Sequence, residues 1–362
     1  MRQNRIYLAA TVFCLICIGV VMIYSSSCVY AMQILKDNAY YLKRHLIFLS
    51  IGFVMTLAVM AIDYRILQKY AKPILLFSVF LLILVLIPGI GKKSSGAQRW
   101  FKLGMISFQP SELVKLAVII YTADFLSRKQ KMITSFRQGF LPLMLMMGSI
   151  CLMVVKQPDL GTTVEIAVVV LAMMFVAGAR LAHLGLIALS AVPVIIYLVT
   201  SASYRMARIT AFLDPWQDAQ GIGFQLTQSQ IAIGSGGWFG VGLGKSQQKL
   251  FYLPAAHTDF IYSIIGEEFG LRGTLFVIFL FVLLLWHGTR IALKTVDSFG
   301  YYICVGILFM FGLQAAVNIG VSMGALPTKG LPLPFISYGG SALIFHMAAI
   351  GLLLNISRIQ DL

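Results

Sequence analysis

Long apolar runs, separated by short polar segments, recur from one end of the chain to the other. Most approach the roughly 20 residues that a helix needs to cross the hydrocarbon core of a bilayer. We expect ten membrane helices, at about 8–30, 46–62, 73–90, 111–127, 139–155, 162–178, 181–200, 260–286, 299–322 and 337–357. The pattern therefore predicts an all-α polytopic membrane protein, with its helices in one bundle and a single domain over residues 1–362.

The amino-acid composition agrees with this assignment. The chain is 59% hydrophobic and 11% charged, with a mean hydropathy of +0.88, whereas soluble domains carry about 25% charged residues. The first apolar run follows Arg2 and Arg5, as in a signal peptide. No small-residue cleavage site follows it, so we expect a first membrane helix instead.

The loops between the expected helices alternate between two sides of the membrane. With ten spans, both termini share one side, and the long connection 201–259 lies on the other, between helices 7 and 8. Lysine and arginine occur in loops on both sides, so an excess of cytoplasmic positive charge does not decide the orientation. A net charge of +15 favours anionic partners, which would be membrane lipid and phosphates on a lipid carrier.

The stretch 221–262 has the most room for chemistry. It is too polar to span a bilayer, it gathers six glycines between residues 234 and 244, and Asp259 stands where an apolar run resumes. Glycines let the backbone turn tightly and approach a ligand closely. We interpret Asp259 as a candidate base. A plain glycine-rich surface loop is the structural alternative.

Ionisable residues near or inside the expected spans mark further candidate positions, because burying them is costly. Glu112 and Lys115 are three residues apart at a helix start, so they share a face and form either a self-satisfied ion pair or part of a cavity. Asp159 precedes the sixth helix, where it can cap the helix or line a cavity. Glu165 lies inside that helix and requires a partner, a cavity or protonation.

Two further segments depart from the pattern of plain membrane helices. Glu267, Glu268 and Arg272 place charges in the eighth expected helix, so its outer part is either broken or extends beyond the bilayer. The segment 326–341 combines three prolines with a pair of glycines. Irregular backbone at membrane depth lines protein or water rather than lipid.

Familiar templates for nucleotide and metal sites do not fit the sequence. Residues 242–246 resemble part of a phosphate-binding loop, but Phe239 occupies the place of its first glycine. His257 could hold a metal only weakly, because no second histidine or cysteine cluster completes a site. No metal ligands are assigned, although a divalent cation (Mg²⁺ or Mn²⁺) could assist. Nothing indicates a nucleic-acid partner.

Ordered motifs along nearly the whole chain resemble those of the SEDS family, the shape, elongation, division and sporulation proteins. The motifs are Gln98–Trp100, Gln109–Lys115, Gln157–Gly161, Gln225–Ser229, Ile233–Gly244, Tyr252–Pro254, His257–Phe260 and Pro332–Ser341. Within the family, the resemblance is stronger to the division members than to the elongation members.

This resemblance implies a ten-helix peptidoglycan glycosyltransferase of the bacterial cytoplasmic (inner) membrane. It implies cytoplasmic termini, an extracytoplasmic active site, and lipid II as the substrate. The implied partners are a class B penicillin-binding protein transpeptidase and other proteins of the division or elongation complex. The resemblance also implies that Asp259 is the catalytic carboxylate, and that Glu112, Lys115 and Asp159 belong to the central cavity.

The residues fit this chemistry. Lipid II carries its own leaving group, a polyprenyl diphosphate, so glycosyl transfer requires a base and cations, whereas a glycosidase uses two carboxylates. We expect Asp259 to deprotonate the acceptor 4-hydroxyl, with inversion at the donor anomeric carbon. We expect Arg208, Lys245 and Lys329 to stabilise the diphosphate and His257 to contact substrate. Contact with lipid headgroups is the structural alternative for the lysines.

Two other functions fit parts of the pattern. A lipid II flippase would use a charged cavity equally well, but it requires no base. A non-catalytic scaffold would only recruit the transpeptidase and would tolerate loss of the carboxylate. The role of Asp259 therefore discriminates among the three functions.

Overall fold

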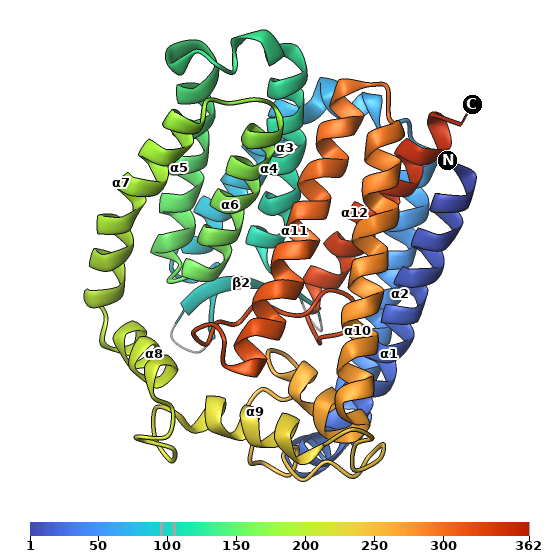
Figure 1. Cartoon of the computed structure of the whole chain (residues 1–362), viewed down its shortest axis with the longest axis vertical. Helices are drawn as coiled ribbons and strands as arrows, with labels where there is room; N and C mark the ends of the chain where they lie inside the picture. Colours follow the sequence, from blue (N-terminus) through green and yellow to red (C-terminus); the bar gives the residue numbers. More distant parts are fainter. Residues whose placement is uncertain (95–96, 104–105, 362) are drawn as a thin grey trace.

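The computed structural model describes residues 1–94, 97–103 and 106–361, so residues 95–96, 104–105 and 362 of the expected domain lie outside the described residues. Within them, eight helical segments are long and apolar enough to cross a membrane. They are α1 (Arg2–Leu35), α2 (Tyr40–Ala61), α3 (Arg65–Leu86), Phe136–Lys156 with α5 (Leu141–Lys156), α7 (Leu181–Thr200), α10 (Ile261–Lys294), α11 (Ser298–Met323) and α12 (Ser341–Ile359). With α4 (Pro110–Arg128) and α6 (Leu160–Val176), they complete the expected ten (Figure 1). The chain is a multi-pass membrane protein.

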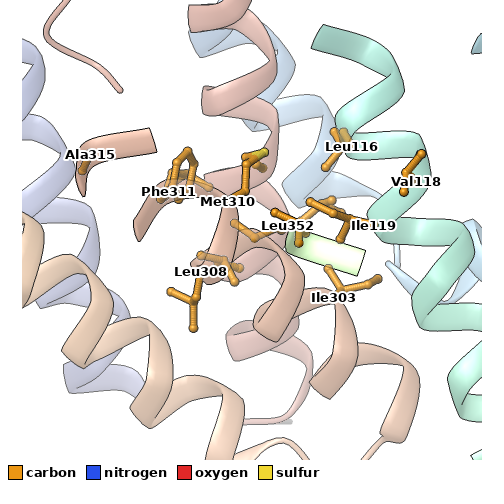
Figure 2. Packing of buried hydrophobic residues seen from close by; sticks show 14 of the residues in the cluster. Leu116, Val118, Ile119, Ile303, Leu308, Met310, Phe311, Ala315 and Leu352 are labelled. Carbon is orange, nitrogen blue, oxygen red and sulfur yellow. The ribbon is translucent and has the colours of Figure 1, made fainter. Parts of the chain in front are cut away.

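The centre of the bundle is formed around α4, α11 and α12. Leu116 and Ile119 of α4 lie close to Ile303 and Met310 of α11 and to Leu352 of α12 in this core (Figure 2). Helix α4 is not one of the eight apolar segments, because it carries several charged residues. It tolerates these charges because neighbouring helices enclose it, and 14 of its 19 residues are buried. The opposite case is α7, which stands at the edge of the bundle (Figure 1) and has no buried residue. Its apolar surface faces lipid.

Several helices extend beyond the apolar runs that predicted them. α2 begins at Tyr40 rather than near residue 46, α3 begins at Arg65 rather than near 73, and α10 continues to Lys294 rather than 286. Lys69 and Lys72 therefore lie in the first turns of α3, not in a loop. The apolar run reports only the part of a helix inside the hydrocarbon, whereas helical hydrogen bonding continues into the polar region.

Two connections that were predicted as loops contain regular structure. The segment 201–259 holds α8 (Ser203–Leu213) and α9 (Phe224–Ser235). The segment 91–110 holds an antiparallel sheet of β1 (Lys92–Ser94), β2 (Ala97–Leu103) and β3 (Ile106–Phe108), in that spatial order. These elements are too short and too mixed in polarity to be detected as apolar runs.

The outer part of α10 is broken, as its charges indicated. Gly270 has φ 67° and ψ −162°, a conformation essentially restricted to glycine. The glycine-rich segment 236–242 crosses this break. Its Val241 N–H donates to Glu267 O (2.9 Å), and the N–H of Leu271, beyond the break, donates back to Gly237 O (2.8 Å).

A buried ion pair holds the next part of this segment. Lys249 Nζ lies 2.9 Å from Glu268 Oε1, and Ser25 Oγ of α1 donates to the same carboxylate at 2.7 Å. The neighbouring Glu267 carboxylate accepts from the Gln247 N–H at 2.7 Å. The chain that leads to Asp259 is therefore anchored to both α1 and α10, and the two glutamates have structural partners.

The variant Gly236→Ala tests the crossing. A Cβ at this position would lie 1.9 Å from Gly266 O, so the two backbones must separate, and we expect a destabilisation of about 2 kcal/mol or more. The measurement is the melting temperature of the purified protein.

The matched control is Gly234→Ala, two residues earlier in α9. Beyond its chain neighbours and the backbone of its own helix, no atom of the described residues lies within 4 Å of a Cβ there, and alanine favours a helix over glycine by about 0.5–1 kcal/mol. We expect this variant to melt at or above the wild-type temperature. Equal melting temperatures for the two variants would contradict a close crossing at residue 236.

Candidate functional site

A cavity of about 530 Å³ lies among α2, the sheet, the starts of α4 and α6, the end of the 236–260 segment and the loop before α12. Its lining includes three carboxylates, from Glu112, Asp159 and Asp259. These residues are far apart in the sequence. The structure therefore brings together the acidic positions that the sequence had marked separately.

Asp259 is half-buried, two residues before α10 begins. Asn318 of α11 donates through Nδ2 to Asp259 O (2.9 Å) and to Leu331 O (2.8 Å). A Cβ on Gly330 would lie 2.9 Å from Asp259 Oδ2. The carboxylate thus lies against the proline-rich loop 324–340, and glycine at position 330 leaves the space that it occupies.

Burial raises the pKa of Asp259 to about 6, and the positive charge of Arg208 opposes this shift. A carboxyl that leaves water loses hydration of its charged form, so its proton is held to higher pH. The group is therefore poised close to neutral pH, which is the range in which a general base is most effective.

His257 lies behind the cavity wall rather than in it. Its ring centroid is 4.4 Å from that of Tyr41 and 6.0 Å from those of Tyr30 and Tyr338, and its carbonyl accepts from Tyr338 N–H at 3.0 Å. Burial lowers the pKa of His257 to about 4, so the ring is neutral at pH 7. Tyr41 and Tyr338 line the cavity in its place.

Lys115 lies beneath Glu112 in a buried network that joins three helices. Its Nζ is 2.9 Å from Glu112 Oε2 and 3.4 Å from Glu165 Oε2, and Gln314 Nε2 of α11 donates to Glu165 Oε1 at 2.6 Å. All four side chains are buried. Glu112 is therefore a member of a buried ion pair that also lines the cavity, and Glu165 has the partners that its position required.

Asp159 performs both tasks that its sequence position allowed. Its Oδ1 accepts from Thr162 N–H at 3.1 Å and caps α6, and its side chain lines the cavity. Arg99 of β2 places a guanidinium nitrogen 3.6 Å from Asp159 Oδ2 and donates through Nε to Gln157 O at 2.7 Å. The sheet is thereby joined to the start of α6.

The cations that line the cavity differ from those expected. They come from α2 and the sheet, and are Arg44, Lys92, Arg99 and Lys102. Lysines and arginines were visible in the segments 31–45 and 91–110, but only the folded sheet brings them to one wall. The Gln98–Trp100 motif was the feature of the sequence that could have indicated this wall, because its Arg99 lines the cavity.

The three expected cations lie elsewhere. Arg208 on α8 and Lys245 in the glycine-rich segment are exposed and do not line the cavity. Lys329 lies behind the wall, where its Cε would be 2.8 Å from a Cβ on Gly161. Burial lowers the pKa of Lys329, and the charges of Glu165 and Asp159 oppose this shift.

No metal ligand set is assigned. Among the residues that the structure describes, no group of three or more His, Cys, Asp or Glu side chains is placed to hold a metal ion. Glu112 is paired with Lys115, and Asp159 caps a helix.

The variant Asn318→Leu tests how Asp259 is held. Leucine has a similar volume but no donor, so two carbonyls lose their hydrogen-bond partner, and we expect a destabilisation of about 2 kcal/mol. The control Ser322→Ala lies one turn further along α11 and removes a buried hydroxyl for which no hydrogen bond is found. Melting temperatures that fall equally in both variants would argue against the bridging role of Asn318.

Comparison with known proteins places these features in a family. A family model for FtsW, RodA and SpoVE, described as "Cell cycle protein", matches residues 5–361. The "Probable peptidoglycan glycosyltransferase FtsW" of Trichlorobacter lovleyi is 47% identical, over 99% of this chain and 94% of its own. Stage V sporulation protein E of Bacillus subtilis is also 47% identical, over 95% and 94%.

Solved structures agree with the sequence relatives. A chain from a structure described as "Structural coordination of polymerization and crosslinking by a peptidoglycan synthase complex" aligns with a TM-score of 0.79 and 28% identity, over 98% of this chain and 97% of its own. The rod shape determining protein RodA of Thermus thermophilus aligns with a TM-score of 0.73 at the same identity and coverage. The fold is therefore shared over nearly the whole chain.

Proposed function

Because the chain belongs to the family of FtsW, RodA and SpoVE, we propose that it is a peptidoglycan glycosyltransferase that polymerises glycan strands from lipid II. The observation that carries this proposal is Asp259, a half-buried carboxylate with a raised pKa in a cavity whose wall bears four cations. A base and a positively charged wall are the two groups that transfer from a sugar diphosphate requires.

Asp259 acts as the general base. At neutral pH most of its carboxyl groups are ionised, since its pKa is about 6. The carboxylate accepts the proton of the acceptor 4-hydroxyl as that oxygen bonds to the donor anomeric carbon. The bond from this carbon to the diphosphate oxygen breaks with inversion, and the polyprenyl diphosphate leaves with the electron pair. A positioned base contributes about 10²–10⁴-fold to such a step.

The cationic wall receives the developing charge. Arg44, Lys92 and Lys102 line the cavity together with Asp259, so they are placed to bind the diphosphate of the donor. Cations that are already in position before the reaction stabilise a leaving anion without reorganisation. We assign this role to them rather than to Lys245, which is exposed outside the cavity.

Several residues that were expected to contact the substrate instead position other groups of the site or shift their pKa. Arg208 lowers the pKa of Asp259 by its charge, and His257 fixes the backbone beside Tyr338. Lys115 holds Glu112 in place, so that Glu112 is available to accept a hydrogen bond from a substrate hydroxyl.

The cavity lies on the extracytoplasmic face in this proposal, with both termini on the cytoplasmic side. The membrane supplies lipid II laterally, and the polymer grows into the space outside. A class B penicillin-binding protein transpeptidase is the partner, in division, elongation or sporulation. The similarity to a chain of a complex described as coordinating polymerization and crosslinking supports such a partner.

The rate of polymerisation should depend on the ionisation of Asp259. Because only the deprotonated carboxylate accepts a proton, the rate falls as the pH decreases through about 6, and one unit lower about one tenth of the ionised base remains. The measurement is polymerisation of purified lipid II by the protein with its transpeptidase, with the melting temperature followed at each pH. A rate that stays constant from pH 7 to pH 5 would exclude Asp259 as the base.

A charge-neutral substitution on the wall should weaken the diphosphate contact. For Lys102→Gln we expect polymerisation roughly tenfold slower, through loss of one charge-assisted contact of about 1.5 kcal/mol. Lys245→Gln removes the same charge outside the cavity and should retain the wild-type rate. If Lys245→Gln is the slower variant, the diphosphate does not bind at the sheet.

A further inference from the structure

A second cavity, of about 350 Å³, lies between the N-terminal end of α1 and the C-terminal end of α10. Its lining includes Arg2 and Asn4 of α1 and Trp286, Arg290 and Lys294 of α10. The two helices meet here at the end of α10 opposite Asp259, near the end of the bundle where both chain termini lie (Figure 1). This cavity therefore has no part in the site described above.

Among the described residues, the charged side chains that line the second cavity are all positive. Arg2, Arg290 and Lys294 contribute cations, and no carboxylate is part of the lining. Over the described ranges, none of these three side chains forms an ion pair, whereas Asp361 pairs with Arg5 and with the ammonium group of Met1, which also belongs to the lining. Three cations facing one cavity repel one another, and an anion bound among them relieves that repulsion.

The walls of the cavity are fixed by contacts between the two helices. His287 Nδ1 lies 3.3 Å from Asn4 Oδ1, and its ring centroid is 5.2 Å from that of Tyr7. The Arg290 guanidinium stacks over the Trp286 ring at 4.8 Å. The stacking restrains the exposed Arg290 guanidinium at the rim of the cavity.

The surroundings are those of a membrane interface. The Trp286 and Ile6 side chains are each more than half exposed, and both stand on membrane-spanning helices close to the cavity. Tryptophan gathers at the headgroup level of bilayers, and exposed apolar side chains beside it contact acyl chains. A ligand bound here would contact positive charge at one end and an apolar surface at the other.

We propose that this cavity binds the phosphate headgroup of an anionic phospholipid, in the leaflet opposite the catalytic cavity. Basic pockets between membrane helices recognise such headgroups, and here the cations and the apolar flank belong to the same two helices. The inference does not depend on the proposed catalytic function, because it concerns binding alone.

The test is native mass spectrometry of the full chain, purified in a neutral detergent and titrated with phosphatidylglycerol. The double variant Arg290→Gln, Lys294→Gln should bind this lipid with about thirtyfold lower affinity, since each basic residue near an anionic lipid contributes about a factor of five. Arg290→Lys keeps the charge and should retain most of the binding. The control Lys69→Gln, Lys72→Gln removes the same charge from exposed positions on α3 at the same end.

Three outcomes would overturn the proposal. Equal losses in the two double variants would mean that only the overall charge attracts the lipid. Binding of phosphatidylcholine as strong as that of phosphatidylglycerol would remove the role of the cations. If inorganic phosphate bound to the cavity as well as the lipid does, the cavity would be a site for soluble anions. A lipid site would be supported if only the Arg290→Gln, Lys294→Gln variant lost affinity for phosphatidylglycerol, and if phosphatidylcholine and inorganic phosphate both bound more weakly than phosphatidylglycerol.

Discussion

The backbone crossing at the break in α10 is the contact on which the position of Asp259 depends. Segment 236–242 lies so close to residues 266–271 that Gly236, Gly240 and Gly270 leave no room for a Cβ. The chain then passes through the buried Lys249 and Glu268 pair before it reaches Asp259. A carboxylate that would otherwise belong to a long loop is thereby held against the bundle, where burial shifts its pKa toward neutrality.

The membrane makes every buried charge costly, and the structure meets this cost in two different ways. Below the cavity, the single cation of Lys115 lies between Glu112 of its own helix and Glu165, so an ion pair joins α4 to α6. Within the cavity, Arg44, Lys92 and Lys102 face a space large enough for a substrate. The buried ion pairs hold the helices together, whereas the cations on the wall face the cavity.

The sequence predicted the features that depend on local pattern. Run lengths gave the ten helices, the position of Asp259 at the start of an apolar run marked a residue that lines the cavity, and the charges of Glu267 and Glu268 indicated a break in α10. The cationic wall could not be predicted, because it requires Arg44 of α2 to line the same cavity as Lys102, which belongs to a sheet whose strands are three to seven residues long. Lys249 was equally hidden, since its partners Glu268 and Ser25 are distant in the chain.

The most direct test of the account is polymerisation of purified lipid II by the variant Asp259→Asn, with the partner transpeptidase present. Asparagine keeps the shape of the side chain but cannot accept the proton, so we predict a rate lower by about 10²-fold or more. The fold should be retained or stabilised, because a carboxylate with a raised pKa disfavours the folded state at pH 7. Polymerisation at the wild-type rate, whether or not lipid translocation is lost, would contradict the catalytic role of Asp259 and favour a flippase or a scaffold.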